Sequence, residues 1–333
     1  MKILVTGGAG FIGSNFVHLL RREKPRWDIV VLDKLTYAGS LDNLDAVWGD
    51  ITFFKGDVAV RADVLGAMEG CDAVVNFAAE THVDRSIVAA DAFIKTDVFG
   101  AFVLLEAARE LGVKRFVQVS TDEIYGEVLE GFSKETDPLM PRNPYAASKA
   151  AADRLAYSYW ATHGVPVVIS RSSNNYGPRQ YPEKLVPLFI TNAIEGKPCP
   201  VYGTGEAVRD WIHVRDHCRA ILLLIEKGEN GEAYNVGGGT LLNTMEMGGA
   251  ILDAVGADKK LLKRVPDRPG HDYRYALDSG KIRELGWEPE HEFAEGIRET
   301  VAWYKKNKEW WEKIKSGEFK RWWKRYYRDQ GRA

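Results

Sequence analysis

The stretch KILVTGGAGFIGSNF, residues 2–16, decides the fold of this chain. It opens with an apolar run typical of a buried strand and passes through Gly7, Gly10 and Gly13 into residues with helical spacing. Gly7 permits a tight turn, Gly10 lets the backbone approach a pyrophosphate, and Gly13 lets the helix lie close to the strand. The order of strand, glycine turn and helix predicts a dinucleotide-binding turn.

A second apolar run, residues 28–33, ends in Asp33, which stands 20 residues after Gly13. A carboxylate at this position accepts hydrogen bonds from an adenosine ribose and repels a 2′-phosphate, which favours NAD over NADP. The alternative is a structural glycine turn with a surface aspartate. The occurrence of strand, turn, helix and acid in this order disfavours that alternative.

Short apolar runs continue along the first half of the chain and alternate with longer stretches of helical spacing. The apolar runs are residues 2–6, 28–33, 51–57, 72–79, 114–120 and 165–170, and helical spacing marks residues 11–22 and 92–111. This alternation predicts an α/β fold with a doubly wound parallel sheet, the Rossmann arrangement. We therefore expect an NAD-binding Rossmann domain over residues 1–171, to which some later segments return.

The pattern becomes irregular from about residue 172, where Pro and Gly are frequent and only short strands are expected. Helices are predicted over 243–255 and 292–305. We expect residues 172–333 to form mainly a smaller α/β lobe that binds the substrate and packs closely on the first domain.

The composition of the chain limits the kinds of molecule that it could bind. The chain has 333 residues, 45% of them hydrophobic, and a net charge of -2, which argues against a nucleic-acid partner, and no apolar run approaches the length of a membrane span. Cys71, Cys199 and Cys218 are scattered and predict neither a disulfide framework nor a cysteine metal site. We expect a cytoplasmic protein.

His213 and His217 lack further ligands at familiar spacing, so we predict a strand-to-helix junction there and no metal.

Tyr145 and Lys149 stand four residues apart within a stretch of helical spacing, residues 144–163. They share one helix face, so the ammonium can favour the phenolate and make Tyr145 a usable base. Alone, such a pair is more often a coincidence on a helix surface.

The run VSTDEIYG, residues 119–126, carries Asp122 and Glu123 side by side at the end of a predicted strand. Adjacent carboxylates repel each other, and burying them costs several kcal/mol, roughly. On these eight residues alone, a solvated loop after the strand is the ordinary interpretation.

The wider pattern resembles the extended short-chain dehydrogenase/reductase superfamily, and within it the nucleotide-sugar 4,6-dehydratases. The resemblance spans both predicted lobes. The stretches that carry it are GGAGFIGS, NFAAETHVDRSI, VSTDEIYGE, NPYAASKAAAD, SRSSNNYGPRQYPEKLVP, VYGTGEAVRDWIHVRDH, YNVGG, DRPGHDYRYALD and WYKKNKEWW.

The resemblance implies a lyase that dehydrates dTDP-glucose to its 4-keto-6-deoxy form, a precursor of rhamnose and other deoxysugars. Tyr145 would remove the proton of the 4-hydroxyl while NAD takes the C4 hydride. Glu123 would remove the C5 proton, and protonated Asp122 would donate to the departing C6 hydroxyl. The hydride then returns to C6. Thr121 would hydrogen-bond the sugar near O4, and Lys149 would support Tyr145.

The same resemblance implies further contacts. The cofactor-binding residues are Gly7, Gly10, Phe11, Ile12, Gly13, Asp33, Lys34, Thr36, Asp57, Val58, Ala78, Ala79, Thr96, Tyr145, Lys149 and Asn175. The substrate-binding residues are Thr81, Thr121, Asn174, Lys184, Leu185, Pro200, Tyr202, Arg209, Asn235, Arg268 and His271. Guanidinium groups bind diphosphate in a bidentate way, which suits Arg209 and Arg268 to that part of the substrate.

Three alternatives remain open. The same reaction on UDP-glucose is the nearest, since relatives that act on it also have the Thr-Asp-Glu triplet. A nucleotide-sugar 4-epimerase is disfavoured because epimerases have small hydroxyl residues where Asp122 and Glu123 stand. A regulator that senses NAD would be expected to lose the Tyr-Lys pair, which this chain retains.

Other features of the sequence lie outside this catalytic pattern. Asp97 stands where the family usually has Asn near the catalytic lysine, and its added negative charge bears on the pH dependence of Tyr145. The tail over residues 305–328 interleaves basic residues with Trp310, Trp311, Trp322 and Trp323, and we expect the tryptophans to pack on the second lobe rather than on nucleic acid or a membrane. Helices over 86–110 and 143–163 carry apolar residues on more than one face, which predicts a homodimer.

Overall fold

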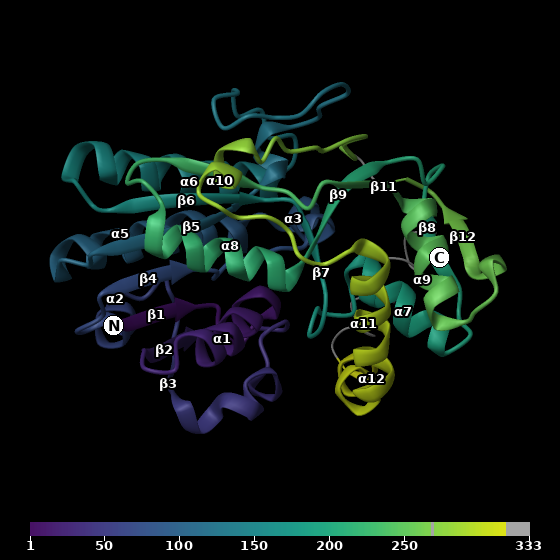
Figure 1. Cartoon of the computed structure of the whole chain (residues 1–333), viewed down its shortest axis with the longest axis horizontal. Coiled ribbons are helices and arrows are strands. Elements are labelled where there is room, and N and C mark those ends of the chain that lie inside the picture. The colour runs from purple at the N-terminus through teal and green to yellow at the C-terminus, as the bar shows by residue number, and fades with distance from the viewer. Residues whose placement is uncertain (268–269, 318–333) are drawn as a thin grey trace.

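A seven-stranded parallel sheet forms the centre of the larger part of the molecule (Figure 1), in the order β3-β2-β1-β4-β5-β6-β10. The computed structural model describes residues 1–267 and 270–317. The strands of this sheet are β1 (Lys2–Thr6), β2 (Asp28–Asp33), β3 (Ile51–Lys55), β4 (Ala73–Asn76), β5 (Arg115–Thr121), β6 (Val167–Ser172) and β10 (Ala233–Val236). The predicted doubly wound α/β fold is thus confirmed.

The sheet is covered on both faces, as its continuous apolar strands predict. Along β1, Ile3 and Val5 contribute to one hydrophobic core and Leu4 to the other, since successive side chains point to opposite faces. The covering helices are α1 (Phe11–Glu23) and α8 (Val214–Lys227) on one face, and α2 (Arg61–Met68), α5 (Gly100–Leu111) and α6 (Pro144–His163) on the other. Strand β10 and helix α8 are therefore late segments that belong to this layered unit. The boundary at residue 171 stays a prediction.

The second unit is smaller and has short strands. A three-stranded sheet has the order β11-β9-β7, and β12 pairs with β8. Its strands are β7 (Asn174–Tyr176), β8 (Cys199–Tyr202), β9 (Val208–His213), β11 (Thr240–Asn243) and β12 (Leu262–Val265), and its helices are α7 (Leu185–Ile194), α9 (Thr244–Val255), α11 (Phe293–Lys306) and α12 (Lys308–Ser316). In Figure 1 these elements lie together at the right of the view.

The tryptophans at the start of the tail pack as expected. Trp311 is fully buried in the core of the second unit, and the Trp310 indole N–H donates to Asn43 Oδ1 over 3.1 Å. Lysine side chains accompany them, and Lys315 lies against the Trp311 ring. Trp322 and Trp323 lie outside the described residues.

Several boundaries differ from those expected. Strands β3 and β4 end earlier than the runs 51–57 and 72–79, because the chain leaves the sheet at the carboxyl ends of these strands to form loops. The stretch 92–111 is not one continuous α-helix. It comprises α4 (Asp91–Phe93), a π-helical turn, η3 (Ile94–Phe99), and α5. Across residues 1–267 and 270–317, none of the helices is both apolar enough and long enough to span a membrane.

The remaining short elements connect these layers. They are η1 (Leu41–Asn43), η2 (Asp45–Asp50), α3 (Val83–Val88), η4 (Asp122–Tyr125), η5 (Lys259–Leu261) and α10 (Gly280–Glu284). The strand-to-helix junction predicted at His213 is confirmed, since β9 ends at that residue and α8 begins at the next.

Candidate active site

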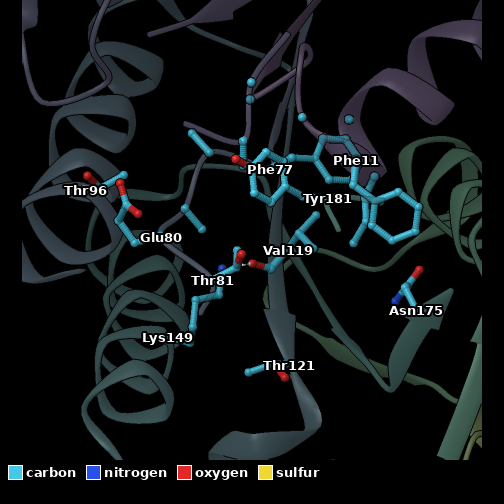
Figure 2. Close-up of a pocket in the computed structure, with 18 of the residues that line it drawn as sticks. Phe11, Phe77, Glu80, Thr81, Thr96, Val119, Thr121, Lys149, Asn175 and Tyr181 are labelled. Carbon is cyan, nitrogen blue, oxygen red and sulfur yellow. Dashed lines mark hydrogen bonds between the residues drawn. The ribbon is translucent and has the colours of Figure 1, made fainter. Parts of the chain in front are cut away.

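A pocket opens at the carboxyl ends of the parallel strands, where the strand order reverses between β1 and β4. This switch point is the usual ligand crevice of open α/β sheets. All the residues predicted for the cofactor line the pocket, and so do the five predicted catalytic residues. Figure 2 shows the aromatic rings of Phe11, Phe77 and Tyr181 gathered at one end, with Thr121 and Lys149 at the other.

The turn between β1 and α1 leaves little room for a side chain at its glycines. Gly7 has a φ of +68°, a conformation that glycine adopts without strain. A Cβ on Gly13 would stand 2.3 Å from the Gly7 carbonyl oxygen, and a Cβ on Gly10 would stand 3.2 Å from the same atom. Helix α1 begins at Phe11 without a side-chain cap, and its first residues line the pocket. The N-terminus of the helix therefore suits an anion in the pocket. These features fit the pyrophosphate of a dinucleotide.

Asp33 holds the turn in place from the end of β2. Its carboxylate accepts hydrogen bonds from the Ala9 N–H over 2.9 Å and the Leu35 N–H over 2.8 Å. Burial raises the pKa of Asp33, and the two backbone hydrogen bonds oppose that effect. Next to it, Lys34 Nζ lies 2.7 Å from Asp57 Oδ2. Asp33 therefore has a structural role as well as a position suited to a ribose.

Several residues that line the pocket were missed from the sequence. They include Gly56, Phe77, Glu80, Ser120, Ser172, Ser173, Gln180, Tyr181 and Glu183. Gly56, Phe77 and Ser173 follow directly after strands of the parallel sheet, and Ser120 and Ser172 lie at the carboxyl ends of β5 and β6. The rule that ligands lie beyond the strand ends could have found these five. Glu183 also receives hydrogen bonds from the Tyr37 hydroxyl, over 2.8 Å, and from Arg85, over 3.1 Å. This cluster joins the loop after β2 to the second unit.

The adjacent carboxylates at the end of β5 have unequal environments. Asp122 is 3% exposed, and burial, followed by the charges of Glu123 and Asp210, raises its pKa well above the ordinary value. Its Oδ1 accepts from the Thr121 hydroxyl over 3.1 Å, whereas its buried Oδ2 has no hydrogen-bond partner among the residues that the structure describes. Glu123 is half-buried and accepts from Asn143 Nδ2 over 3.2 Å. Asp122 therefore favours its protonated form.

Tyr145 lies beside these carboxylates in the first turn of α6. Burial raises its pKa well above the usual value, and the charges of Glu123 and Asp97 add to that effect. A side-chain hydrogen bond with Thr121 acts in the opposite direction. Thr121 thus contacts both Tyr145 and Asp122. A cation bound in the pocket would lower the pKa of Tyr145 and help to form the phenolate.

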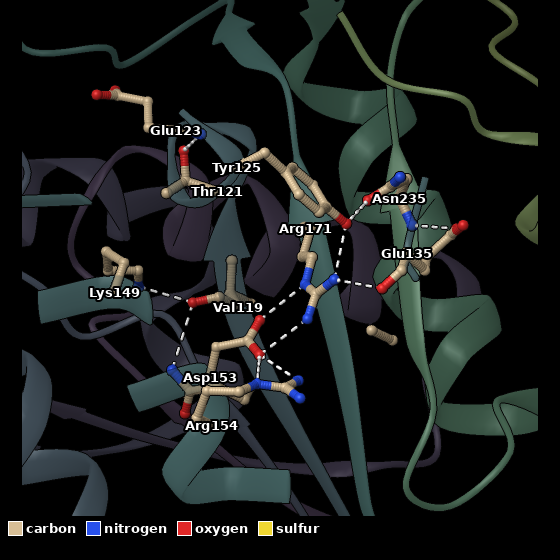
Figure 3. Close-up of polar contacts among 12 residues, drawn as sticks. Val119, Thr121, Glu123, Tyr125, Glu135, Lys149, Asp153, Arg154, Arg171 and Asn235 are labelled. Atoms are coloured by element: carbon tan, nitrogen blue, oxygen red, sulfur yellow. Dashed lines mark hydrogen bonds and ion pairs between the residues drawn. The ribbon is translucent and has the colours of Figure 1, made fainter. Parts of the chain in front are cut away.

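Lys149 follows one turn later on α6. Its Nζ donates to the Val119 carbonyl over 2.7 Å, and burial lowers its pKa while Asp97 and Asp153 oppose the shift. The lysine is thereby fixed against β5 at the floor of the pocket (Figure 3). The shared helix face of Tyr145 and Lys149, predicted from their spacing, is present on α6.

A buried polar network lies next to the end of the pocket that holds Thr121 and Lys149 (Figure 3). Arg171 on β6 pairs with Asp153 on α6 through two hydrogen bonds of 2.9 and 3.0 Å, and it also donates to the Tyr125 hydroxyl over 2.7 Å. Tyr125 in turn donates to Asn235 Oδ1 over 2.8 Å, and the Asn235 N–H donates to Glu135. The network joins α6, β6, β10 and the turn that follows Asp122. Removing one member of such a pair leaves a buried charge without a partner.

The predicted substrate residues divide into two groups. Thr81, Thr121, Asn174 and Lys184 line the pocket, and the Lys184 ammonium donates to the Thr81 carbonyl. Leu185, Pro200, Tyr202, Arg209, Asn235 and His271 do not line it, and Arg268 lies outside the described residues. Asn235 is fully buried in the network above. The assignment of this second group to the substrate stays a prediction.

A cluster elsewhere in the described chain brings His213, His291 and Glu299 together, with ligand atoms within 4.8 Å of one another. The two imidazole rings stack with centroids 4.1 Å apart, and Arg215 pairs with Glu299 over 3.0 Å. Nitrogen lone pairs lie in the planes of their rings, so stacked rings direct them side by side rather than toward one ion. We therefore assign no metal to this cluster.

The parallel sheet, the glycine turn and the Tyr-Lys pair facing one pocket define a short-chain dehydrogenase/reductase of the extended type. The family model described as GDP-mannose 4,6 dehydratase matches residues 4–300. The chain therefore belongs to this dehydratase family.

Individual relatives agree with that assignment. A dTDP-glucose 4,6-dehydratase of Streptomyces niveus is 52% identical over 323 residues, which cover 95% of this chain and 96% of that protein. The crystal structure of a dTDP-glucose 4,6-dehydratase from Streptomyces venezuelae with NAD bound has a TM-score of 0.92 and 49% identity, covering 94% of this chain and 100% of that one. A UDP-glucose 4-epimerase of Thermus thermophilus in complex with NAD has a TM-score of 0.85 and 35% identity, with coverages of 92% and 100%.

Proposed function

We propose that this chain is an NAD-dependent lyase that converts dTDP-glucose to dTDP-4-keto-6-deoxy-glucose. The observation that carries this proposal is the pair Asp122 and Glu123 beside Tyr145, with one carboxylate buried and the other half-buried. An elimination of water needs both a base and an acid, and unequal environments provide them. The names of the relatives from Streptomyces niveus and Streptomyces venezuelae support the same reaction.

The first step is oxidation at C4. Tyr145 accepts the proton of the 4-hydroxyl, and Thr121, which already contacts Tyr145, orients that hydroxyl. NAD, held in the pocket beside the glycine turn and Asp33, would supply a hydride acceptor for C4 and the hydride for C6, so that it would be regenerated in each turnover. Lys149 stands at the floor of the same pocket, where its ammonium favours the phenolate.

The second step is loss of water. The ketone at C4 makes the C5 proton acidic, and Glu123 removes it. Asp122 gives its proton to the C6 hydroxyl, which leaves as water while a double bond forms between C5 and C6. The unpartnered Oδ2 of Asp122 supports its role as the donor, since it has no competing contact within the described protein. A proton returns to C5 when the hydride reaches C6, which completes the product.

A nucleotide-sugar 4-epimerase is the alternative that the fold alone would allow, as the similarity to the Thermus thermophilus enzyme illustrates. Epimerisation requires oxidation and reduction at C4 alone and gives no task to Asp122 or Glu123. Their position in the pocket therefore favours the dehydratase.

The direct test is incubation of the purified protein with dTDP-glucose, first without added NAD, while the 4-keto sugar is followed by its absorbance in strong alkali. UDP-glucose is run in parallel. Product from dTDP-glucose is expected, and product without added NAD would show that the cofactor co-purifies. Product from UDP-glucose alone would transfer the proposal to that substrate. Absence of product from both, with NAD supplied, would contradict the dehydratase and leave an epimerase or a regulator.

We also propose a cytoplasmic homodimer. Large apolar side chains are exposed on neighbouring elements η3, α5 and α6: Ile94 at 54%, Phe99 at 48%, Phe102 at 39% and Tyr157 at 39%. A second copy of the chain placed on this face would remove them from water. Light scattering should give twice the monomer mass, and Phe102→Glu should lower it.

The three buried free cysteines support a reducing compartment, where the product would feed deoxysugar formation such as that of rhamnose.

A further inference from the structure

Asp97 lies between helix α6, which carries Tyr145 and Lys149, and the loop that follows β4. It lies in the π-helical turn η3 and is 3% exposed. Its Oδ1 accepts from the Glu80 N–H over 2.8 Å, and its Oδ2 contacts the Ser148 hydroxyl over 2.7 Å. One carboxylate therefore connects the loop that follows β4 with the residue between Tyr145 and Lys149. Irregular π turns of this kind often occur at functional sites.

The hydrogen atom of Ser148 is shared between two acceptors. Ser148 Oγ lies 2.7 Å from Asp97 Oδ2 and 2.8 Å from the Tyr145 carbonyl oxygen. A hydroxyl has one hydrogen to donate, so an ionised Asp97 and the carbonyl compete for it. If Asp97 Oδ2 carries a proton, it donates to Ser148, which then donates to the carbonyl, and both contacts are satisfied. The geometry thus accommodates a neutral group at position 97.

We propose that Asp97 is a positioning residue whose carboxylate sets the pH range in which Tyr145 and Lys149 work. The inference rests on the proposed function, since it concerns the same pair. In the ionised form, the negative charge of Asp97 disfavours the Tyr145 phenolate and stabilises the Lys149 ammonium. In the neutral form it completes the chain of hydrogen bonds through Ser148 to the first turn of α6.

The charged groups around Asp97 support this role. Burial raises the pKa of Asp97 to about 6, while Lys149 lowers it. In return, the charge of Asp97 adds to the effect of burial, which raises the pKa of Tyr145, and opposes the effect of burial, which lowers the pKa of Lys149. Glu80 is also affected, since burial and then the charge of Asp97 raise its pKa.

Other charges face the catalytic pair from further elements. Asp153 on α6 acts on Lys149, while Asp122 and Glu123 act on Tyr145. Arg85 acts on Glu80 from α3. None of these groups accepts from Ser148 in the described structure, so Asp97 alone among them combines the charge with the hydrogen-bonded contact.

The test is Asp97→Asn, which removes the charge and retains the shape. The amide oxygen still accepts from Glu80, and its NH2 donates to Ser148, which leaves Ser148 free to donate to the Tyr145 carbonyl. Both limbs of the pH profile of kcat/KM for dTDP-glucose should move to lower pH by about one unit, equivalent to about a tenfold change in the ionisation ratio. A purely structural role would lower the rate without moving the limbs.

Asp91→Asn is the matched control, since Asp91 is exposed on the neighbouring α4 and the change in charge is the same. Its profile should coincide with that of the unmodified protein. Ser148→Ala supplies a second variant if Asp97→Asn does not fold. Loss of the hydroxyl removes a hydrogen bond that lowers the pKa of Asp97, so the profile should move in the same direction by a smaller amount.

An infrared titration gives a readout that does not depend on turnover. One component of the C=O absorption of protonated carboxylic acids should disappear between about pH 5 and 7 in the unmodified protein, and this component should be missing in Asp97→Asn. Superimposable pH profiles for the two proteins, or equal shifts in Asp97→Asn and Asp91→Asn, would overturn the inference. Inactivity of the unmodified protein would contradict the proposed function instead, while the infrared titration would still test the ionisation of Asp97.

Discussion

The two turns that follow β1 and β5 face the same pocket but are constructed differently. The first is shaped by backbone, since Gly7 and Gly13 allow the chain to approach itself too closely for any side chain. The second is shaped by the side chains of Thr121, Asp122 and Glu123, where burial and then the charge of Glu123 raise the pKa of Asp122. The first is therefore suited to the proposed cofactor, whereas the second places the proposed proton donors and acceptors in the pocket at a cost in stability. Mutations should separate these two contributions.

The largest effect is expected for Tyr145→Phe, which removes the proton acceptor for C4 oxidation and leaves the glycine turn intact. The value of kcat for dTDP-glucose should fall by about 10³-fold, while the NAD content of the purified protein stays unchanged. Tyr157→Phe on the same helix is the control, because Tyr157 is 39% exposed and does not line the pocket. A comparable loss in both variants would contradict a specific role for Tyr145.

The next effect concerns the carboxylate pair. Glu123→Gln should lower kcat by about 10²- to 10³-fold, because the C5 proton then has no base. Oxidation at C4 should still occur, so absorbance of reduced cofactor should rise in a single turnover and persist. Asp122→Asn should show a smaller loss, since an amide still donates a hydrogen bond to the departing hydroxyl.

Glu130→Gln, in an exposed part of the loop after the triplet, is the control for this pair and should have ordinary activity. If Glu123→Gln gave no reduced cofactor, Glu123 would be needed for the oxidation step instead of the elimination. That result would remove the difference in roles proposed for the two carboxylates.

The glycine turn should respond differently. Gly13→Ala places a Cβ 2.3 Å from the Gly7 carbonyl oxygen, so α1 must shift away from β1. We expect the free energy of unfolding to fall by about 1–3 kcal/mol, together with weaker NAD binding. Gly66→Ala in α2 meets no atom within 4 Å and should stabilise the protein by about 0.5–1 kcal/mol. Chemical denaturation and calorimetric titration with NAD measure both effects, and equal stabilities for the two variants would contradict the close approach.

The sequence predicted the layered sheet well because the information is local. Six of the seven strands correspond to the expected apolar runs, and the run 28–33 matches β2 fully. Strand β10 was not among those runs. Helix boundaries at 144–163 were equally clear, since Asn143 caps the first turn and Gly164 ends the last one. The π-helical turn at 94–99 was not predicted, because its residues have ordinary helical spacing and the extra residue per turn depends on packing against α6.

Some parts of the site could be predicted from the sequence, whereas others could not. The spacing of the glycines and Asp33 indicated a dinucleotide from physical chemistry alone. By contrast, the roles of Asp122 and Glu123 came from resemblance to a family, and only the structure shows which of the two is buried. The contact of Asp97 with Ser148 joins residues that are 51 positions apart, so no local pattern could have indicated it.

The smallest expected effect is on the free energy of unfolding, through the ionisation of Asp122. Because its pKa is raised in the folded state, the unfolded chain loses this proton first as the pH rises. The contribution of Asp122 to stability is therefore fully present below the pKa of the unfolded state and declines above it, by about 1.4 kcal/mol for each unit of pKa difference. Asp122→Asn cannot ionise, so it should match the unmodified protein near pH 4 and exceed its free energy of unfolding at pH 8 by at least about 1.4 kcal/mol, the value of one unit of pKa difference. Denaturation at the two pH values measures this gap. A variant that lost activity without gaining stability at pH 8 would show that Asp122 is ionised in the folded protein, and the proton donor for the departing hydroxyl would then have to be another group.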